Sequence, residues 1–161
     1  MGDLKFHEAS GIAGRIIVAR VSTGTDIVEG IEEICEKYNI EAAIVSVVIG
    51  SLQRAEITYA VPKSDTKMKA GKGEPLCLEG PLDCLSAQGT VGRNEKGERY
   101  AHIHAALADK LDHVYGGHLA RGKNPVLLTV EVALTEVTGL RLVRRLYEET
   151  NTSQLSPEVI E

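Results

Sequence analysis

The chain lacks the residues and runs that mark several common protein classes. It has no tryptophan and a single phenylalanine in 161 residues, so its core has to be built from valine, isoleucine, leucine and alanine. No apolar run approaches the roughly 20 residues of a membrane-spanning helix. The first ten residues also have neither the basic nor the apolar region of a signal peptide. We therefore expect a cytoplasmic protein with no membrane segment.

Cysteine is scarce as well. The three cysteines, Cys35, Cys77 and Cys84, form an odd number and have no C-x-x-C spacing. Such a set is poorly suited to a disulfide framework or to a cysteine-rich metal site. We expect buried free thiols, which behave as small apolar side chains.

Excess basic charge and the usual nucleotide-binding motifs are missing too. The formal net charge is −5, whereas proteins that neutralise DNA phosphates usually present a basic face. Two short basic clusters, residues 63–72 and 141–145, are interpreted as a solvated loop and the outer face of a strand. The chain has no GxxxxGKS/T loop, no GxGxxG after a strand and no nucleophile elbow.

One helix is expected after a turn at residues 22–25. Asp26 can cap it, with Glu29 three residues later in a pattern like a capping box. An apolar stripe follows at helical spacing, and glutamates occupy the opposite face: Ile27, Ile31, Ile34 and Tyr38 against Glu29, Glu32, Glu33 and Glu36. The pattern predicts an amphipathic helix that lies on a sheet and ends near Asn39.

The remaining apolar segments are short and rich in β-branched residues, which favours strands. They cover residues 15–21, 42–49, 54–61, 76–78, 81–91, 100–107, 125–134 and 140–146. A mobile loop is expected at residues 62–75 and a loosely held polar tail at residues 148–161. The predicted class is α+β, with a mainly antiparallel sheet of six to eight strands packed by one long helix and one or two short ones. We expect a single domain over residues 1–161, its core at about residues 12–147.

Four of the five histidines lie between residues 100 and 119, and three of them form a pattern. On a strand, His102 and His104 point to one face, because successive side chains alternate. His118 follows Gly116 and Gly117, which let the backbone turn tightly and approach that strand. Three imidazoles with one open coordination position describe a site for zinc or a similar metal. A purely structural, hydrogen-bonded group of histidines is the alternative.

Several acidic side chains could assist such a site as a fourth ligand, an orienting group or a general base. The candidates are Asp83, Asp109, Asp112 and Glu131. Asp109 could instead stabilise a turn, and Glu131 could lie on a solvent-facing edge, so the catalytic residues stay unknown at this stage. His7 and His113 have no partner at a fixed spacing, and we expect both on the surface.

The same residues resemble the plants and prokaryotes conserved (PPC) domain family, in its stand-alone prokaryotic form. The resemblance rests on the H-x-H pair, the run Gly116 to Leu119 and the following strand LLTVEVAL. It extends to Gly50-Ser51-Leu52, to the run Glu79 to Leu82 and to Glu149-Thr150, so that it covers about residues 12–150. At Asp83-Cys84 this chain departs from the glutamate and aliphatic residue that are common in the family.

The resemblance implies an antiparallel α+β domain that assembles as a homotrimer. It also implies a metal, usually zinc, held near subunit interfaces at the positions of His102, His104 and His118. The family's fold is similar to that of acetolactate decarboxylase, whose zinc is likewise held by three histidines. Although the family is often labelled DNA-binding, its plant members contact DNA through AT-hooks outside the domain, and no Arg-Gly-Arg-Pro hook occurs here.

Three hypotheses follow for the function. The leading one is a cytoplasmic, homotrimeric protein that binds a zinc-like metal and a small molecule in an intersubunit cleft. This protein would be an enzyme if the metal assists a lyase or hydrolase reaction. The second hypothesis is a DNA-binding or transcription-associated regulatory module, for which the acidic net charge makes nucleic acid a doubtful partner. In the third, the histidines only stabilise the trimer.

Overall fold

The computed structural model describes residues 6–148 and 150–160, and over these residues the chain is mostly strand. The elements are β1 (Ile12–Ser22), α1 (Ile27–Lys37), β2 (Ala43–Thr58), β3 (Ala60–Pro62), β4 (Ala70–Lys72), β5 (Leu76–Arg93), β6 (Arg99–Ala108), β7 (Val114–Leu119), β8 (Val126–Thr138), β9 (Leu140–Tyr147) and β10 (Thr152–Val159). The predicted class, a single α+β domain with a mainly antiparallel sheet, is confirmed in outline.

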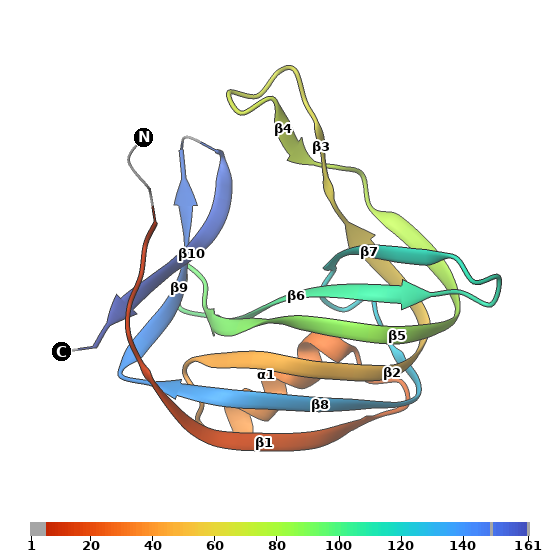
Figure 1. The fold of residues 1–161 in the computed structure, drawn as a ribbon, viewed down its shortest axis with the longest axis horizontal. Helices are drawn as coiled ribbons and strands as arrows, with labels where there is room; N and C mark the ends of the chain where they lie inside the picture. Colours follow the sequence, from red (N-terminus) through yellow and green to blue (C-terminus); the bar gives the residue numbers. More distant parts are fainter. Residues whose placement is uncertain (1–5, 149, 161) are drawn as a thin grey trace.

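Eight strands form one sheet in the order β1-β8-β2-β7-β6-β5-β9-β10 (Figure 1). Strand β2 also pairs with β5, so the pairings β2–β5, β5–β6, β6–β7 and β7–β2 close on themselves and curl the sheet. Strands β3 and β4 form a separate hairpin that stands away from the sheet. On the other side of the molecule, β9 and β10 form a second projecting hairpin.

The helix α1 packs against β6 and β8, and its position follows from its apolar stripe. Ile27 and Ile31 are fully buried in the main core, where they meet inward-facing side chains of the sheet such as Ile103. Asp26 caps the helix as predicted, since its carboxylate accepts a hydrogen bond of 3.0 Å from the backbone N–H of Glu29.

The helix differs from the prediction in length and in one side chain. It spans 11 residues, about the average for globular proteins, and the described residues contain no further α-helix. The expected long helix and its short companions are therefore wrong. Glu32, predicted on the solvent face, is 94% buried because Arg121 and the backbone of β6 supply partners for its carboxylate.

Two expected breaks in the chain contain strand residues, one of them only in part. Residues 42–49 and 54–61, predicted as separate strands, are largely joined in β2, which passes through Gly50 with φ of +145°. A Cβ on Gly50 would lie 2.2 Å from the carbonyl oxygen of Thr129 in β8, so glycine at this position permits β2 and β8 to approach each other. The expected mobile loop at residues 62–75 contains β4, which pairs with β3.

The predicted loose tail is also corrected, because residues 152–159 form β10. This strand pairs along its whole length with β9, and the Tyr147 hydroxyl lies 2.7 Å from the Ser156 hydroxyl. Leu155 packs against a small second core of Ala42, Leu140 and Leu142. Pro157 is tolerated because β10 is an edge strand, where the missing N–H leaves no ladder bond unmade.

Two further expectations can be compared with the fold. All three cysteines are free thiols, as predicted, and Cys35 and Cys84 are buried. The predicted burial of Cys77 is wrong, because this side chain is exposed. Burial raises the pKa of the Cys35 and Cys84 thiols to about 11, so neither is a ready nucleophile. Within the described residues, no helix combines the length and the apolar character needed to cross a bilayer.

The buried Glu32 should stabilise the packing of α1 against β6, the strand that carries His102 and His104. Its carboxylate accepts hydrogen bonds from the Ala101 backbone N–H at 3.0 Å and from Nε of Arg121 at 2.8 Å. We expect Glu32→Ala to lower the free energy of unfolding by about 1–3 kcal/mol, because it leaves a buried N–H unpaired. Glu33→Ala, one residue along and exposed, should change it by less than about 0.5 kcal/mol in the same urea titration. Equal effects of the two substitutions would contradict this role.

Candidate metal centre

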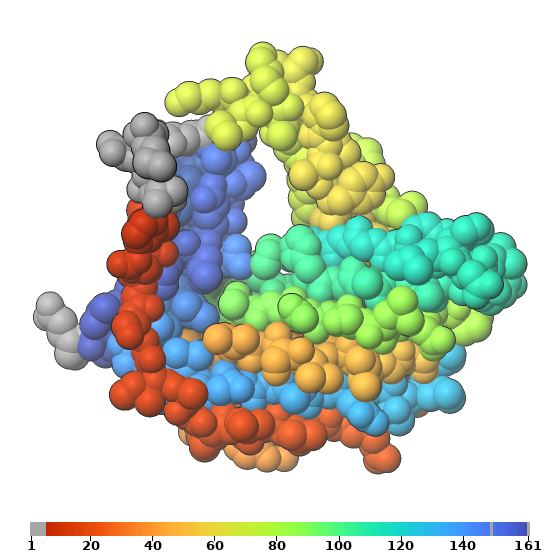
Figure 2. All heavy atoms as spheres, viewed as in Figure 1, coloured from red at the N-terminus to blue at the C-terminus, as the bar shows by residue number. Residues whose placement is uncertain are grey.

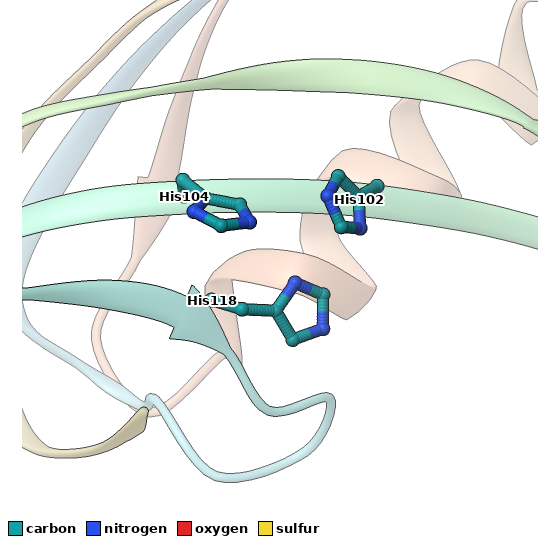
Figure 3. A group of neighbouring side chains, drawn as sticks. All are labelled: His102, His104 and His118. Atoms are coloured by element: carbon teal, nitrogen blue, oxygen red, sulfur yellow. The ribbon is translucent and has the colours of Figure 1, made fainter. Parts of the chain in front are cut away.

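Strand β6 alternates as predicted and so directs its histidines to one side. Ala101, Ile103 and Leu107 are buried in the core, while His102 and His104 lie on the other face of the strand. This alternation comes directly from the pleat of a β-strand. In Figure 3 both imidazoles leave the same side of β6.

His118 reaches the same place from the neighbouring strand. It lies in β7, directly opposite His104 in the antiparallel register, so that their side chains share a face. Gly116 and Gly117 are part of this strand, and the predicted tight turn there is wrong. The predicted approach to the strand of His102 and His104 is right, because β7 pairs with β6 and Gly117 lies opposite Ala105. A Cβ on Gly117 would also lie 2.7 Å from the carbonyl oxygen of Thr58 in β2.

The three imidazoles gather around one point (Figure 3). Ring centroids are 4.9 Å apart for His102 and His104, 4.6 Å for His102 and His118, and 5.5 Å for His104 and His118. One nitrogen from each ring lies within 4.8 Å of the others. Nδ1 of His118 is buried and has no hydrogen-bond partner among the described residues. Because buried polar atoms are almost always satisfied, the donor set fits a bound metal ion.

The protonation of the site also suits metal binding. Desolvation is the main cause that lowers the pKa of His102 to about 3, and the charges of Arg144, His118, His104 and Lys72 add to it. Desolvation, followed by the charge of Lys72, lowers the pKa of His118 to about 4. Both imidazoles are therefore neutral at physiological pH, which is the form that ligates a metal.

Around the histidines lie small residues and basic side chains. A shallow hollow of about 300 Å³ beside His104 is lined by Ser86, Ala87, Gln88, Ala105, Ala106 and Gly117. The guanidinium carbon of Arg144, from β9, stands 5.8 Å from the ring centroid of Tyr100, two residues before His102. The charge of Lys72, from β4, acts on His102 and His118 as well.

None of the candidate carboxylates joins the three histidines among the described residues. Asp83 is exposed on β5, opposite Ala108. Glu131 is exposed on β8, opposite Arg20, in agreement with the alternative that it faces solvent. Asp112 lies in the turn before β7 with φ of +62°.

Asp109 stabilises a turn, which was the alternative to a role at the metal site. Its Oδ1 accepts hydrogen bonds from the backbone N–H of Leu111 at 2.7 Å and of His113 at 3.0 Å. Its Oδ2 accepts one from the Tyr115 hydroxyl and lies 3.1 Å from Nδ1 of His113. His113 and His7 are both exposed, as predicted.

Sequence reasoning missed Arg144 and Lys72 as neighbours of the histidines. Both were interpreted as members of solvated basic clusters, in one of which Arg144 stands next to Arg145. The β-alternation of β9 was the available signal, since it turns neighbouring side chains to opposite faces. Which face meets β6 depends on the curl of the sheet.

Comparison with known proteins identifies the family. The model of the Plants and Prokaryotes Conserved (PCC) domain, also abbreviated PPC, matches residues 8–138. A metal-containing protein from Archaeoglobus fulgidus is 30% identical, with a TM-score of 0.75 over 94% of this chain and 99% of that one. A plant- and prokaryote-conserved protein from Pyrococcus horikoshii is 25% identical, with a TM-score of 0.75 over 92% and 97%. No match was found among curated proteins.

A third structure of the same fold comes from Ralstonia eutropha. It is 20% identical and has a TM-score of 0.68 over 86% of this chain and 89% of that one. At this identity the likeness shows the fold alone.

The lowered pKa values predict how the metal-free protein responds to acid. His102 and His118 stay neutral in the folded state, whereas in the unfolded chain they take up protons below their ordinary pKa of about 6.5. Their contribution to stability is thus complete above about pH 6.5 and is lost as the pH falls towards about 4 and then 3. We expect that, as the pH is lowered, the free energy of unfolding of a His102→Gln/His118→Gln variant decreases less steeply than that of the wild type. Urea unfolding with chelator present measures this. Identical slopes from pH 7 to 5 would contradict it.

Proposed function

This chain belongs to the plants and prokaryotes conserved family, and we propose that it is a cytoplasmic, homotrimeric member that binds a zinc-like metal. The ligands are His102, His104 and His118. The observation that carries the proposal is the convergence of three imidazoles from β6 and β7, with a buried Nδ1 of His118 that lacks a hydrogen-bond partner in the described part of the chain. The metal-containing relative from Archaeoglobus fulgidus, 30% identical over almost the whole chain, supports it.

The site has the properties of a centre that acts on a small molecule. Three imidazoles leave one coordination position open, and the hollow beside His104 offers space of small-molecule size. When bound, a zinc-like ion would polarise a carbonyl or carboxylate oxygen or lower the pKa of a bound water. His104 and His118 face each other across the β6–β7 ladder, so the protein holds these two ligands by backbone pairing. A metal-dependent lyase or hydrolase activity belongs to this proposal.

Assembly is proposed on the sheet face that carries the histidines. Exposed apolar side chains lie in two cross-strand rows on this face: Val18 and Val47 on either side of the part-buried Ala133, and Ile16 and Ile44 on either side of the part-buried Thr135. The second row continues through Thr90 to His102. Contiguous exposed apolar surface marks interaction sites, and a second copy of this chain is the occupant that we propose. The metal centre would then lie close to the interface.

DNA binding has weaker support as an alternative. The Ralstonia eutropha structure and one from Bacteroides thetaiotaomicron are described as candidate DNA-binding proteins, but they are 20% and 14% identical. The net charge of −5 opposes contacts with phosphates. We therefore rank metal-dependent small-molecule binding first.

Elemental analysis of the purified protein tests the metal centre. We expect about one metal ion per chain in the wild type and almost none in a His102→Ala/His104→Ala variant, because a single imidazole cannot hold the ion. His113→Ala is the matched control, since His113 is exposed and lies against Asp109. Metal well below one per chain that is unchanged in the double variant would refute the proposal.

Sedimentation velocity tests the assembly. The wild type should sediment as a trimer, and a Val18→Asp/Val47→Asp variant should shift to monomer, because each buried charge costs several kcal/mol. Both valines are exposed in the single chain, at 77% and 40%. Leu111→Asp, a similarly exposed position in the turn before β7, should leave the trimer intact. A wild-type monomer, or a trimer that survives the double substitution, would exclude this interface.

A further inference from the structure

The charges around the three histidines are all of one sign. Arg144 and Lys72 both act on His102 and His118, and no carboxylate joins the cluster within residues 6–148 and 150–160. The two basic residues come from opposite sides, Lys72 from β4 and Arg144 from β9. Figure 2 shows the surface hollowed between the hairpins that contain these strands, above β6.

Arg144 differs from most other arginines of the described chain. Five of them form ion pairs with glutamates: Arg15, Arg93, Arg99, Arg121 and Arg145. Arg144 is half-buried, and its one close aromatic neighbour is the ring of Tyr100. Burial lowers the pKa of its guanidinium, although not enough to remove the charge, because arginine is effectively always protonated. A half-buried guanidinium with no carboxylate partner among residues 6–148 and 150–160 is an unusual cost for a fold to retain.

A bound metal would increase this imbalance. Three neutral imidazoles leave the full double charge of the ion uncompensated, beside two further positive side chains. The positive charges of Arg144 and Lys72 repel a cation held beside them. An anion at the open coordination position removes the conflict, since it can ligate the metal and accept hydrogen bonds from the guanidinium together.

We propose that the metal centre binds small molecules through an oxyanion group, a carboxylate or a phosphate, which Arg144 pairs with and orients while Lys72 attracts it. This inference rests on the proposed metal site and names the class of its ligand. Arg144 is suited to the role because a planar guanidinium donates two parallel hydrogen bonds to an oxyanion. Lys72 is exposed, so its charge acts more weakly and is screened by salt. Ser86 and Gln88 line the hollow beside His104 and offer polar contacts to the rest of the bound small molecule.

The test uses the cobalt(II)-loaded protein, whose visible absorption reports directly on the coordination of the metal. Sodium acetate and inorganic phosphate are titrated separately, with acetamide as the neutral counterpart of acetate. We expect a saturable spectral change with at least one of the two anions and none with acetamide at equal concentration. Whichever anion binds more tightly identifies the group that the site prefers. A response to acetamide equal to that of the anions, or no response to either anion, would overturn the proposal.

Variants then assign the role to Arg144. Arg144→Gln should bind cobalt as well as the wild type but weaken anion binding by about tenfold, the effect of losing a charge-assisted hydrogen bond. Arg144→Lys keeps the positive charge but lacks the two parallel N–H donors, so its anion affinity should lie between those of the wild type and Arg144→Gln. Lys72→Gln should weaken binding by about two- to threefold at low salt only. Arg145→Gln is the matched control, because the neighbouring Arg145 pairs with Glu158.

The outcomes separate the two proposals. A protein that takes up no cobalt fails the proposed function, and the anion site falls with it. One cobalt per chain with anion affinity unchanged in Arg144→Gln overturns only the inference about Arg144. If that variant folds poorly, as judged by its thermal unfolding, the comparison of acetate with acetamide on the wild type still decides whether the site selects anions.

Discussion

The antiparallel pairing of β6 with β7 is the constraint on which the candidate centre depends. It sets His118 directly opposite His104, and the two-residue period of β6 adds His102 on the same face. Strand β2 stabilises this arrangement, because it pairs with both β5 and β7 and so closes the curl of the sheet. Gly117 lets β2 come this close, because any side chain there would strike the backbone at Thr58.

The electrostatics of the site follow from what surrounds this pairing. Burial keeps His102 and His118 neutral, while Arg144 and Lys72 raise the local positive potential and no carboxylate of the described chain offsets it within the cluster. A site of this kind attracts anions and favours metal ligands that carry negative charge. The same sheet face continues into exposed apolar rows, so that metal binding, ligand selection and assembly would share one surface.

Local patterns were sufficient where the structure depends on near neighbours in the chain. The alternation in residues 100–107 predicted which side chains of β6 enter the core, and the Asp26 cap predicted where α1 begins. Patterns failed where a distant partner decides the outcome. Glu32 is buried because Arg121 and Ala101 meet it, and the polar residues 152–159 become β10 because β9 lies beside them.

Local sequence was enough to predict the fold class, the family and the three histidines, with His102 and His104 on one face of their strand. It could do so because strand period, helix capping and the spacing of H-x-H and Gly-Gly-His are properties of short segments. Only the tertiary structure decided that Gly116 and Gly117 lie within a strand, that Asp109 serves a turn, and that Arg144 faces the histidines while Arg145 does not. These placements depend on pairing between segments far apart in the sequence, such as β9 with β5 and β2 with β7, which no local pattern encodes.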